Sequence, residues 1–446
     1  MIPVLTPEEM TAVDAAAPEP LDMLVERAAA AVAREAERML GGTYGRRVVV
    51  VAGKGNNGAD GRAAADRLRR RGARVVVVDA ASSPADLPPC DLVIDAAYGT
   101  GFHGSYVAPR SPAGVRVLAV DIPSGVDGLT GEAEDGAVRA DVTVTFAALK
   151  PGLLLAAGPD HSGRVEVADI GLDVDGARMH LLEDADVAAR LPRRPRESHK
   201  WQAAVFVAAG SPGLTGAALL AGRAAMRAGA GSVRLGVPGA DLALLPLAEM
   251  VGVPLPAEGW AAAALEAAER CRSLVVGPGL GRDSRTVGEV RRLLGGASHP
   301  AVVDADGLAA VDGLVPGEAP RVLTPHEGEY RRLCGSAPGA DRVGAVRALA
   351  ERTGAVALLK GPTTVVAAPG GEVRFVTSGG PRLATAGSGD VLSGVIGAFL
   401  ACGLDGLDAA SLGAHAHGAA AALGPERGLV AGDIVELLPR WLSHHA

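Results

Sequence analysis

The sequence contains very little lysine for its number of basic residues. Lysine and arginine together account for 43 of the 446 residues, and only Lys54, Lys150, Lys200 and Lys360 are lysines. Arginine replaces lysine readily on a solvated surface, but its broad guanidinium cannot replace a compact ammonium where the backbone closes tightly around a bound group. Each of the four lies next to glycine, proline or histidine. We therefore treat them as candidate site residues, with retention by chance as the alternative for any one of them.

Other scarcities exclude whole classes of protein. Hydrophobic residues make up 48% of the sequence but aromatic residues only 3%, so the cores must be built from Val, Leu and Ala. A formal charge of -8 without a long basic run argues against nucleic-acid binding. The four cysteines are far apart and form no metal-binding spacing, which favours a reducing compartment. With no signal-peptide pattern and no apolar run of membrane length, we predict a cytoplasmic protein that binds neither nucleic acid nor membranes.

Apolar runs and their spacing predict two α/β domains. A chain of 446 residues is too long for one ordinary core. Short β-branched runs separated by expected helices indicate buried parallel strands in both halves. These runs cover residues 47–52, 74–80, 92–96, 115–121 and 142–146 in the first half, and 203–208, 232–237, 274–277, 301–304, 322–324 and 355–359 in the second.

A proline-broken, charged segment divides the two domains, because it suits neither a helix interior nor a central strand. The predicted boundaries are 1–190, a linker at 191–197, and 198–446. Both domains are expected to be doubly wound. The first is expected to be a Rossmann-like α/β sandwich with a helical layer at residues 7–40, and the second to contain a hairpin at 363–377. We also predict a homo-oligomer, although the Ala-rich helix at 415–422 suits a subunit interface and a domain core equally well.

The strongest local motif is Ala386-Gly387-Ser388-Gly389-Asp390, which opens an apolar helix. A helix start offers unpaired N–H groups and a positive dipole end, and glycines let an anion approach the backbone, so the motif is typical of a phosphate site. Asp390 could take the proton from a hydroxyl that attacks phosphorus. The alternative is that Asp390 only caps the helix.

Further polar segments fall at the carboxyl ends of predicted strands, where open α/β sheets bind their ligands. These are residues 277–281, 304–306, 324–329 and 360–364. A lone histidine such as His326 is usually structural, so it counts as a ligand contact only because of these neighbours.

In order, the motifs SHK, GSPGLTGAALLA, GPGLG, DADGL, TPHEGE, LLKGPTT and TAGSGDVLSG resemble those of the ADP-dependent NAD(P)H-hydrate dehydratases, which have a ribokinase-like fold. The resemblance runs from about Ser198 to the end of the chain and implies Asp390 as the catalytic base. It implies that ADP, accompanied by Mg²⁺, is bound by Lys360, Gly361, Pro362, Thr363, Thr364 and Gly389. The hydrated nucleotides NADHX and NADPHX would contact Ala217, Gly279, His326 and Asp390.

A second glycine-rich segment, GKGNNGADG at residues 53–61, lies between a predicted strand and a predicted helix, so its amides could hold a diphosphate. Its two asparagines and Asp60 add donors and acceptors that phosphate does not require, which suggests a sugar, an amide or a cation as well. A capped polar turn is the alternative. Asp95 and Asp121 lie at the ends of further predicted strands and indicate the same crevice.

The segments GKGNNGADG, DAAYGTGFHGS, DIPSGVDGLTG and FAALKPG resemble the NAD(P)H-hydrate epimerase domain over most of residues 1–170. The resemblance implies a potassium ion held by Asn57, Asp95 and Ser124. Either Asp121 or Lys150 would exchange the proton during epimerisation. Ala59 stands where the family usually has glycine, and its methyl group would crowd a ligand if the backbone there has a positive φ. The substrate contacts implied are Asn56, Asn57, Gly58, Ala59, Asp60, Gly99, Thr100, Gly101, Phe102, His103, Gly104, Ser105 and Asp121.

Both resemblances together predict a bifunctional enzyme that repairs hydrated NADH and NADPH. The first domain would interconvert the R and S hydrates, and the second would dehydrate the S hydrate at the expense of ADP, releasing AMP and phosphate. One alternative is a ribokinase-like small-molecule kinase with an N-terminal nucleotide-binding module, which would release a stable phosphoester. Another is an N-terminal half that senses a nucleotide or binds a partner without catalysis.

Overall fold

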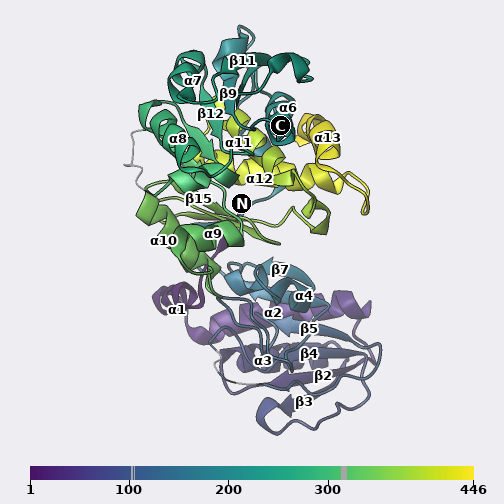
Figure 1. Cartoon of the computed structure of the whole chain (residues 1–446). Coiled ribbons are helices and arrows are strands. Elements are labelled where there is room, and N and C mark those ends of the chain that lie inside the picture. Colours follow the sequence, from purple (N-terminus) through teal and green to yellow (C-terminus); the bar gives the residue numbers. More distant parts are fainter. Residues whose placement is uncertain (102–103, 105, 313–318, 446) are drawn as a thin grey trace. The chain divides into compact units, whose positions relative to one another are not determined.

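The computed structural model describes residues 1–101, 104, 106–312 and 319–445, which form two compact units (Figure 1). The N-terminal unit is Ile2–Met179, and the C-terminal unit is His180–Ala446 together with Met1. Helix α5 (Asp184–Arg190) belongs to the C-terminal unit, where Arg190 donates to Asp408 of helix α12 (Gly406–Ala422) at 2.8 Å. The units therefore divide ahead of the predicted linker at 191–197.

The N-terminal unit is built on a parallel sheet whose order creates a crevice. The strands lie in the order β3, β2, β4, β5, β6, β7. Because β3 and β4 lie on opposite sides of β2, the loops that follow β2 and β4 diverge, and ligands bind at such a switch point. The bounds are β2 (Arg47–Ala52), β3 (Arg74–Asp79), β4 (Leu92–Ala96), β5 (Arg116–Val120), β6 (Val142–Phe146) and β7 (Arg164–Ala168).

Helices cover one face of this sheet. Alternate residues such as Val50 and Ile94 pack against α2 (Leu21–Leu40) and α3 (Asn56–Arg70), whereas Val51 and Val93 face loops on the other side. Helices were expected between all the strands, but between β3 and β6 the described part of the connections forms only a 3-10 turn (Ala80–Ser82). Their Pro, Gly and Ser content suits loops instead.

The helical layer predicted at residues 7–40 consists of two helices. Helix α1 (Pro7–Ala16) follows the short strand β1 (Ile2–Val4) and begins with a capping box between Thr6 and Glu9. It ends before the Pro-Glu-Pro segment at residues 18–20, because proline interrupts helical hydrogen bonding. After β6, the turn Pro151–Leu153 and helix α4 (Gly158–Ser162) lead into β7.

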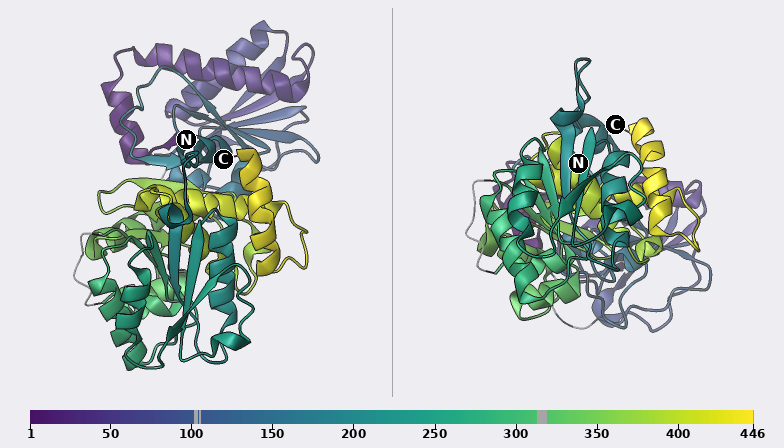
Figure 2. Two further views of the ribbon diagram at one scale, coloured as in Figure 1. Left: turned by 90° about the horizontal axis from the view of Figure 1, so that it is seen from above. Right: turned by 45° about the horizontal axis from the view of Figure 1, so that its top comes forward.

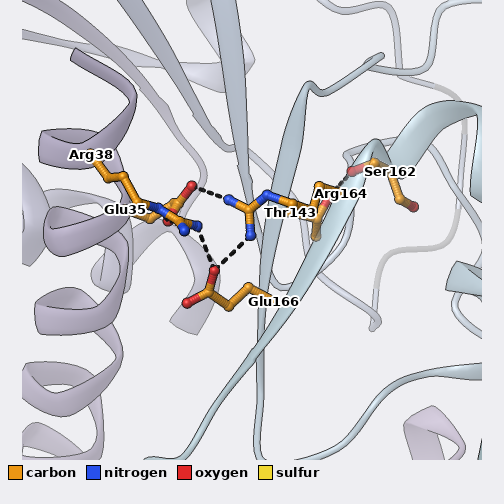
Figure 3. Close-up of polar contacts among 6 residues, drawn as sticks. All are labelled: Glu35, Arg38, Thr143, Ser162, Arg164 and Glu166. Atoms are coloured by element: carbon orange, nitrogen blue, oxygen red, sulfur yellow. Dashed lines mark hydrogen bonds and ion pairs between the residues drawn. The ribbon is translucent and has the colours of Figure 1, made fainter. Parts of the chain in front are cut away.

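A charged cluster ties helix α2 to the edge strand β7 (Figure 3). The buried carboxylate of Glu35 accepts hydrogen bonds from Arg38 Nε at 2.7 Å and Arg164 Nη2 at 2.5 Å. Both arginines also donate to Glu166, at 2.7 and 2.8 Å. Alternate residues of β7 are exposed, so these ion pairs supplement the limited apolar packing of that strand.

The C-terminal unit has a larger sheet with helices on both faces (Figure 2). Parallel strands lie in the order β11, β10, β9, β12, β13, β14, β15, and the predicted hairpin β16–β17 continues the sheet in antiparallel fashion. Leu182, just after β8 (Met179–Leu181), donates to Phe375 of β17 at 3.0 Å. The bounds are β9 (Ala204–Ala208), β10 (Ser232–Pro238), β11 (Val251–Leu255), β12 (Ser273–Val276), β13 (Ala301–Val303), β14 (Arg321–Leu323), β15 (Val356–Leu359), β16 (Thr364–Ala367) and β17 (Val373–Val376).

Helix α12 lies in the core of its own unit. Almost all of its residues are buried, among them the Ala-rich stretch at 415–422, so this stretch is core and no longer supports the predicted oligomer. With α6 (Gly216–Arg227), α11 (Ser388–Ala401) and α13 (Ala431–His445) it covers one face, and α7 (Trp260–Ala268) and α8 (Ser284–Gly296) cover the other. Helices α9 (Glu327–Cys334) and α10 (Arg342–Thr353) follow β14. None of the described helices has the length and apolar character needed to cross a membrane.

We predict that Glu35→Ala lowers the free energy of unfolding of the N-terminal unit by about 1–3 kcal/mol, because two arginines lose charge-assisted hydrogen bonds to a buried acceptor. Urea denaturation followed by circular dichroism measures the change. Asp86→Ala is the control, since it removes an ion pair with Arg110 that is exposed on both sides. Equal effects of the two substitutions would contradict the role given to the cluster.

Candidate active sites

A cavity of about 840 Å³ opens at the carboxyl ends of the N-terminal strands, at the switch point between β2 and β4. Its walls come from α1, α2, the start of α3 and the loops after β4, β5 and β6. Eight of the residues predicted from the sequence line it: Asn56, Asn57, Asp60, Gly99, Thr100, Gly101, Asp121 and Lys150.

An ion pair between Asp121 and Lys150 forms the floor of this cavity. Lys150 is 1% exposed, and its Nζ donates to Asp121 Oδ1 at 2.6 Å, Thr145 Oγ1 at 2.8 Å and the Phe146 carbonyl at 3.3 Å. These three acceptors match the three N–H donors of an ammonium. Asp121 has a φ of 68°, an uncommon conformation for a residue other than glycine and one that is often found at functional sites.

Two of the three predicted potassium ligands, Asp95 and Ser124, are hydrogen-bonded to each other at a buried carboxylate. Asp95 accepts hydrogen bonds from the Ser124 hydroxyl at 2.7 Å and the Ser124 amide at 2.8 Å. Burial raises the pKa of Asp95 to about 6, although these hydrogen bonds act in the opposite direction. Both side-chain polar atoms of Asn57 are buried without a hydrogen-bond partner within the described structure. An unpaired amide oxygen and a buried carboxylate without a cation suit a hard cation.

The remaining predicted contacts of this unit are placed differently. Gly58 and Ala59 lie in the first turn of α3 and do not line the cavity. Ala59 is not among the positive-φ residues, so its methyl group does not create the crowding considered from the sequence. Gly104 has a φ of 138° and lies outside the cavity lining. Phe102, His103 and Ser105 fall outside the described residues.

Sequence reasoning missed the contribution of α1 to this site. Asp14 lines the cavity, and burial raises its pKa, an effect opposed by Lys150 and reinforced by Asp121. No motif marks Asp14, because its position depends on how α1 folds over the strand ends. Lys54 lines the same cavity. Lys200 does not, and its ammonium lies over the Trp201 ring.

In the C-terminal unit, a second lysine–aspartate pair lies beside the glycine loop. Lys360 follows β15, and its Nζ donates to Asp304 Oδ1, after β13, at 2.7 Å. The hydroxyl of Ser393, on α11, donates to the other oxygen of Asp304 at 2.6 Å. Burial tends to raise the pKa of Asp304, but the Lys360 charge and these hydrogen bonds outweigh it and hold the pKa below its ordinary value.

Asp390 lies in the first turn of α11, next to this pair. Burial raises its pKa to about 6, with a further increase from Asp304 that Lys360 partly offsets. The helix begins after Gly387, which has a φ of 89° that glycine adopts without strain. Within the described structure, the carboxyl of Asp390 accepts no capping hydrogen bond at the start of α11. The structure therefore does not support the alternative that Asp390 only caps the helix.

The other predicted residues lie around the same strand ends. A Cβ placed on Gly279 would lie 3.3 Å from the Ala217 Cβ, so these two predicted substrate contacts are neighbours. His326 is the N-cap of α9, and its Nδ1 accepts from Gly328 N–H at 2.9 Å. Its ring therefore has a structural role, and its Nε2 lies 3.6 Å from Glu329 Oε1 in the same helical turn. Residues 360–363 form the connection between β15 and β16, Thr364 is the first residue of β16, and Arg342 donates to the Lys360 carbonyl at 3.2 Å.

Two features of this unit had no signal in the sequence. Burial and the Lys360 charge lower the pKa of His417 to about 4, so this histidine of α12 is neutral. Its Nε2 has no partner within the part of the chain described. A cavity of about 490 Å³ lies next to α12 and is lined by residues such as Ser378, Arg382 and Gly418.

Comparison with known proteins matches both units. A family model described as NAD(P)H-hydrate dehydratase matches residues 205–440, and one described as YjeF-related protein N-terminus matches residues 21–87 and 78–152. The bifunctional NAD(P)H-hydrate repair enzyme Nnr of Mycobacterium leprae is 40% identical over 95% of this chain and 94% of its own. That of Moorella thermoacetica is 37% identical over 94% and 92%.

A solved structure has the fold of the C-terminal unit. It is the ADP/ATP-dependent NAD(P)H-hydrate dehydratase of Bacillus subtilis co-crystallised with ATP and Mg²⁺, which is 31% identical, with a TM-score of 0.53 over 59% of this chain and 98% of that one. The ribokinase-like fold expected for this unit is also found in an Enterococcus faecalis protein, at 22% identity and a TM-score of 0.54. With relatives matched over nearly its full length, the chain belongs to the family of bifunctional NAD(P)H-hydrate repair enzymes.

Proposed function

We propose that the protein restores hydrated NADH and NADPH in two steps, one in each unit, and acts in the cytoplasm. The C-terminal unit dehydrates the S hydrate with ADP, and the N-terminal unit interconverts the R and S hydrates. The observation that carries this proposal is the pair of strand-end sites, each with a lysine–aspartate ion pair beside a further carboxyl group. The family to which the chain belongs supports both activities.

In the C-terminal unit, Asp390 is the general base. A hydroxide ion is a poor leaving group and a phosphate is a good one, so phosphorylation of the S hydroxyl makes its loss possible. Asp390 accepts the hydroxyl proton as the terminal phosphoryl group of ADP is transferred, and phosphate then leaves as the ring double bond re-forms. Lys360 and the amides at the start of α11 hold the phosphates, because both attract anions.

Magnesium fits this site as a companion of the nucleotide, whose phosphate charge it neutralises. Among the described residues, no group of three or more His, Cys, Asp or Glu side chains could hold a metal ion. The proposed nucleotide contacts are Lys360, Gly361, Pro362, Thr363, Thr364 and Gly389, and the proposed hydrate contacts are Ala217, Gly279, His326 and Asp390.

A small-molecule kinase would use the same loop and the same base, but it would release a stable phosphoester. The epimerase-like unit favours repair, because its cavity retains acid–base groups that a binding module would not need.

Within the cavity of the N-terminal unit, Asp121 exchanges the proton and Lys150 holds Asp121 in place. All three ammonium donors of Lys150 are already engaged, so it cannot itself accept a proton in this arrangement.

We predict that the purified protein restores the near-ultraviolet absorbance of NADH completely from a mixture of R and S hydrates when ADP and Mg²⁺ are supplied. Recovery of the R fraction faster than its uncatalysed conversion requires both units, because dehydration alone consumes only the S fraction. Recovery of the S fraction alone would remove the epimerase assignment. Accumulation of a stable phosphorylated product without NADH would favour the kinase instead.

We predict that Asp390→Asn lowers the dehydration rate by about 10²–10⁴-fold, because the amide cannot accept the hydroxyl proton. ADP affinity, measured by calorimetry, should change little. In the wild type the base must be ionised, so with a pKa of about 6 the rate should fall as the pH decreases through 6. A rate that stays constant down to pH 5 would contradict Asp390 as the base.

The buried oxygen atoms of Asn57, Asp95 and Ser124 are proposed to hold potassium, which would fix the loops around the N-terminal cavity. We predict that potassium chloride raises the unfolding temperature of the N-terminal unit above its value in choline chloride of equal ionic strength, because a bound ion stabilises the folded state. Asn57→Ala should abolish this difference, and Asn56→Ala, one residue away and outside the ligand set, should retain it. The absence of a potassium-specific shift in the wild type would refute the site.

A further inference from the structure

The cavity of the N-terminal unit contains more acid–base groups than a binding site requires. Its titratable side chains come from α1, α3 and the loops after β2, β4, β5 and β6, whereas α2 and the segment after β7 contribute only apolar ones. They are Asp14 on α1, Lys54 after β2, Asp60 on α3, Tyr98 after β4, Asp121 after β5 and Lys150 after β6. Lys150 is fixed by three acceptors and Lys54 is exposed to solvent, so among the charged groups the carboxyl groups are the ones placed to exchange protons inside the cavity.

Two of these carboxyl groups are held in opposite protonation states. Asp121 forms the salt bridge with Lys150 and is therefore the ionised partner. Asp60 is 8% exposed, and the negative charges of Asp121 and Asp14 disfavour its ionised form. Burial, reinforced by Asp121 and then by Asp14, raises the pKa of Asp60 to about 8. Near pH 7 the cavity thus presents a protonated carboxyl group together with a carboxylate.

Epimerisation of the hydrate needs such a pair. The hydroxyl-bearing carbon is bonded to the ring nitrogen, so its C–O bond breaks when the hydroxyl gains a proton and leaves as water, while the nitrogen lone pair forms a C=N⁺ bond. Water then adds to the opposite face of the planar carbon and loses a proton to a base. One proton is given and one is accepted, and the nearby carboxylates stabilise the transient positive charge.

We propose that Asp60 is a catalytic residue of the epimerase, giving its proton to the departing hydroxyl, while Asp121 accepts the proton of the water that adds to the other face. The roles exchange in the reverse direction, and solvent returns the free enzyme to its starting protonation state. This inference rests on the epimerase function proposed above. It differs from an assignment to Asp121 or Lys150 alone, because it needs a second carboxyl group that is protonated in the resting enzyme.

The test compares Asp60→Asn with Asp66→Asn. Both substitutions make the same chemical change on α3, but Asp66 is exposed and pairs with Arg69 on the same helix. The rate of R-to-S conversion, with the uncatalysed rate subtracted, is followed by NMR in the presence of each variant. Asp60→Asn should lose about 10²-fold or more in rate, and Asp66→Asn should match the wild type.

Three further readouts separate a catalytic role from a structural one. In the wild type, epimerisation should fall as the pH rises through about 8, and the residual activity of Asp60→Asn should lack this limb. Water labelled with ¹⁸O should enter the hydroxyl during conversion. An infrared difference spectrum between wild type and variant at pH 7 should contain a protonated-carboxyl band, which can be recorded whatever the activity of the variant.

The outcomes distinguish this inference from the proposed function. Wild-type protein without epimerase activity would refute the proposed function itself. If the wild type is active, any one of three results would refute the role of Asp60 while leaving the proposed function standing. These results are an equally active Asp60→Asn variant, no incorporation of ¹⁸O, and no protonated-carboxyl band. Dehydration of purified S hydrate, which takes place in the other unit, should be the same in both variants and the wild type.

Discussion

Both candidate sites depend on an ion pair between a lysine and an aspartate at the carboxyl ends of two parallel strands, which are neighbours in the N-terminal unit and are separated by β14 in the C-terminal unit. Lys150 contacts Asp121 at 2.6 Å in one unit, and Lys360 contacts Asp304 at 2.7 Å in the other. An ammonium that is withdrawn from water is costly unless acceptors surround it, so each pair requires correctly placed neighbours and in turn fixes the loops that supply them. A guanidinium could not reach three acceptors from one atom as Lys150 Nζ does, which accounts for lysine at position 150 in an arginine-rich chain.

Each ion pair leaves another carboxyl group nearby without a cation of its own. Burial is then the largest influence on the pKa of that carboxyl group, and the charges of the ion pair change it further. The pKa of Asp390 is about 6, which leaves it ionised and able to accept a proton near pH 7. The pKa of Asp60 is about 8, which leaves it protonated and able to give one. Under the proposed function, the same arrangement would provide a base in one unit and an acid in the other.

The sequence predicts what is local and misses what depends on packing. Central strands such as β4 and β6 match the predicted ranges, because each is a continuous buried run. The edge strands β7 and β11 were missed, since exposed residues interrupt them and β11 contains Pro254. The site loops were found through their glycines and acids. The pairing of Lys360 with Asp304, 56 residues apart, and the place of Asp14 required the folded chain.

Glycine completes each site by leaving its charged groups open to a ligand. A Cβ on Gly389 would lie 3.4 Å from Lys360 Nζ, and a Cβ on Gly99 would lie 3.5 Å from Asp121 Oδ2. Neither glycine is among the positive-φ residues, so backbone conformation does not require glycine at either place. A larger side chain would instead cover the ammonium or the carboxylate. Gly389 and Gly99 therefore serve ligand access, and their value depends on the lysine–aspartate pair that lies behind each of them.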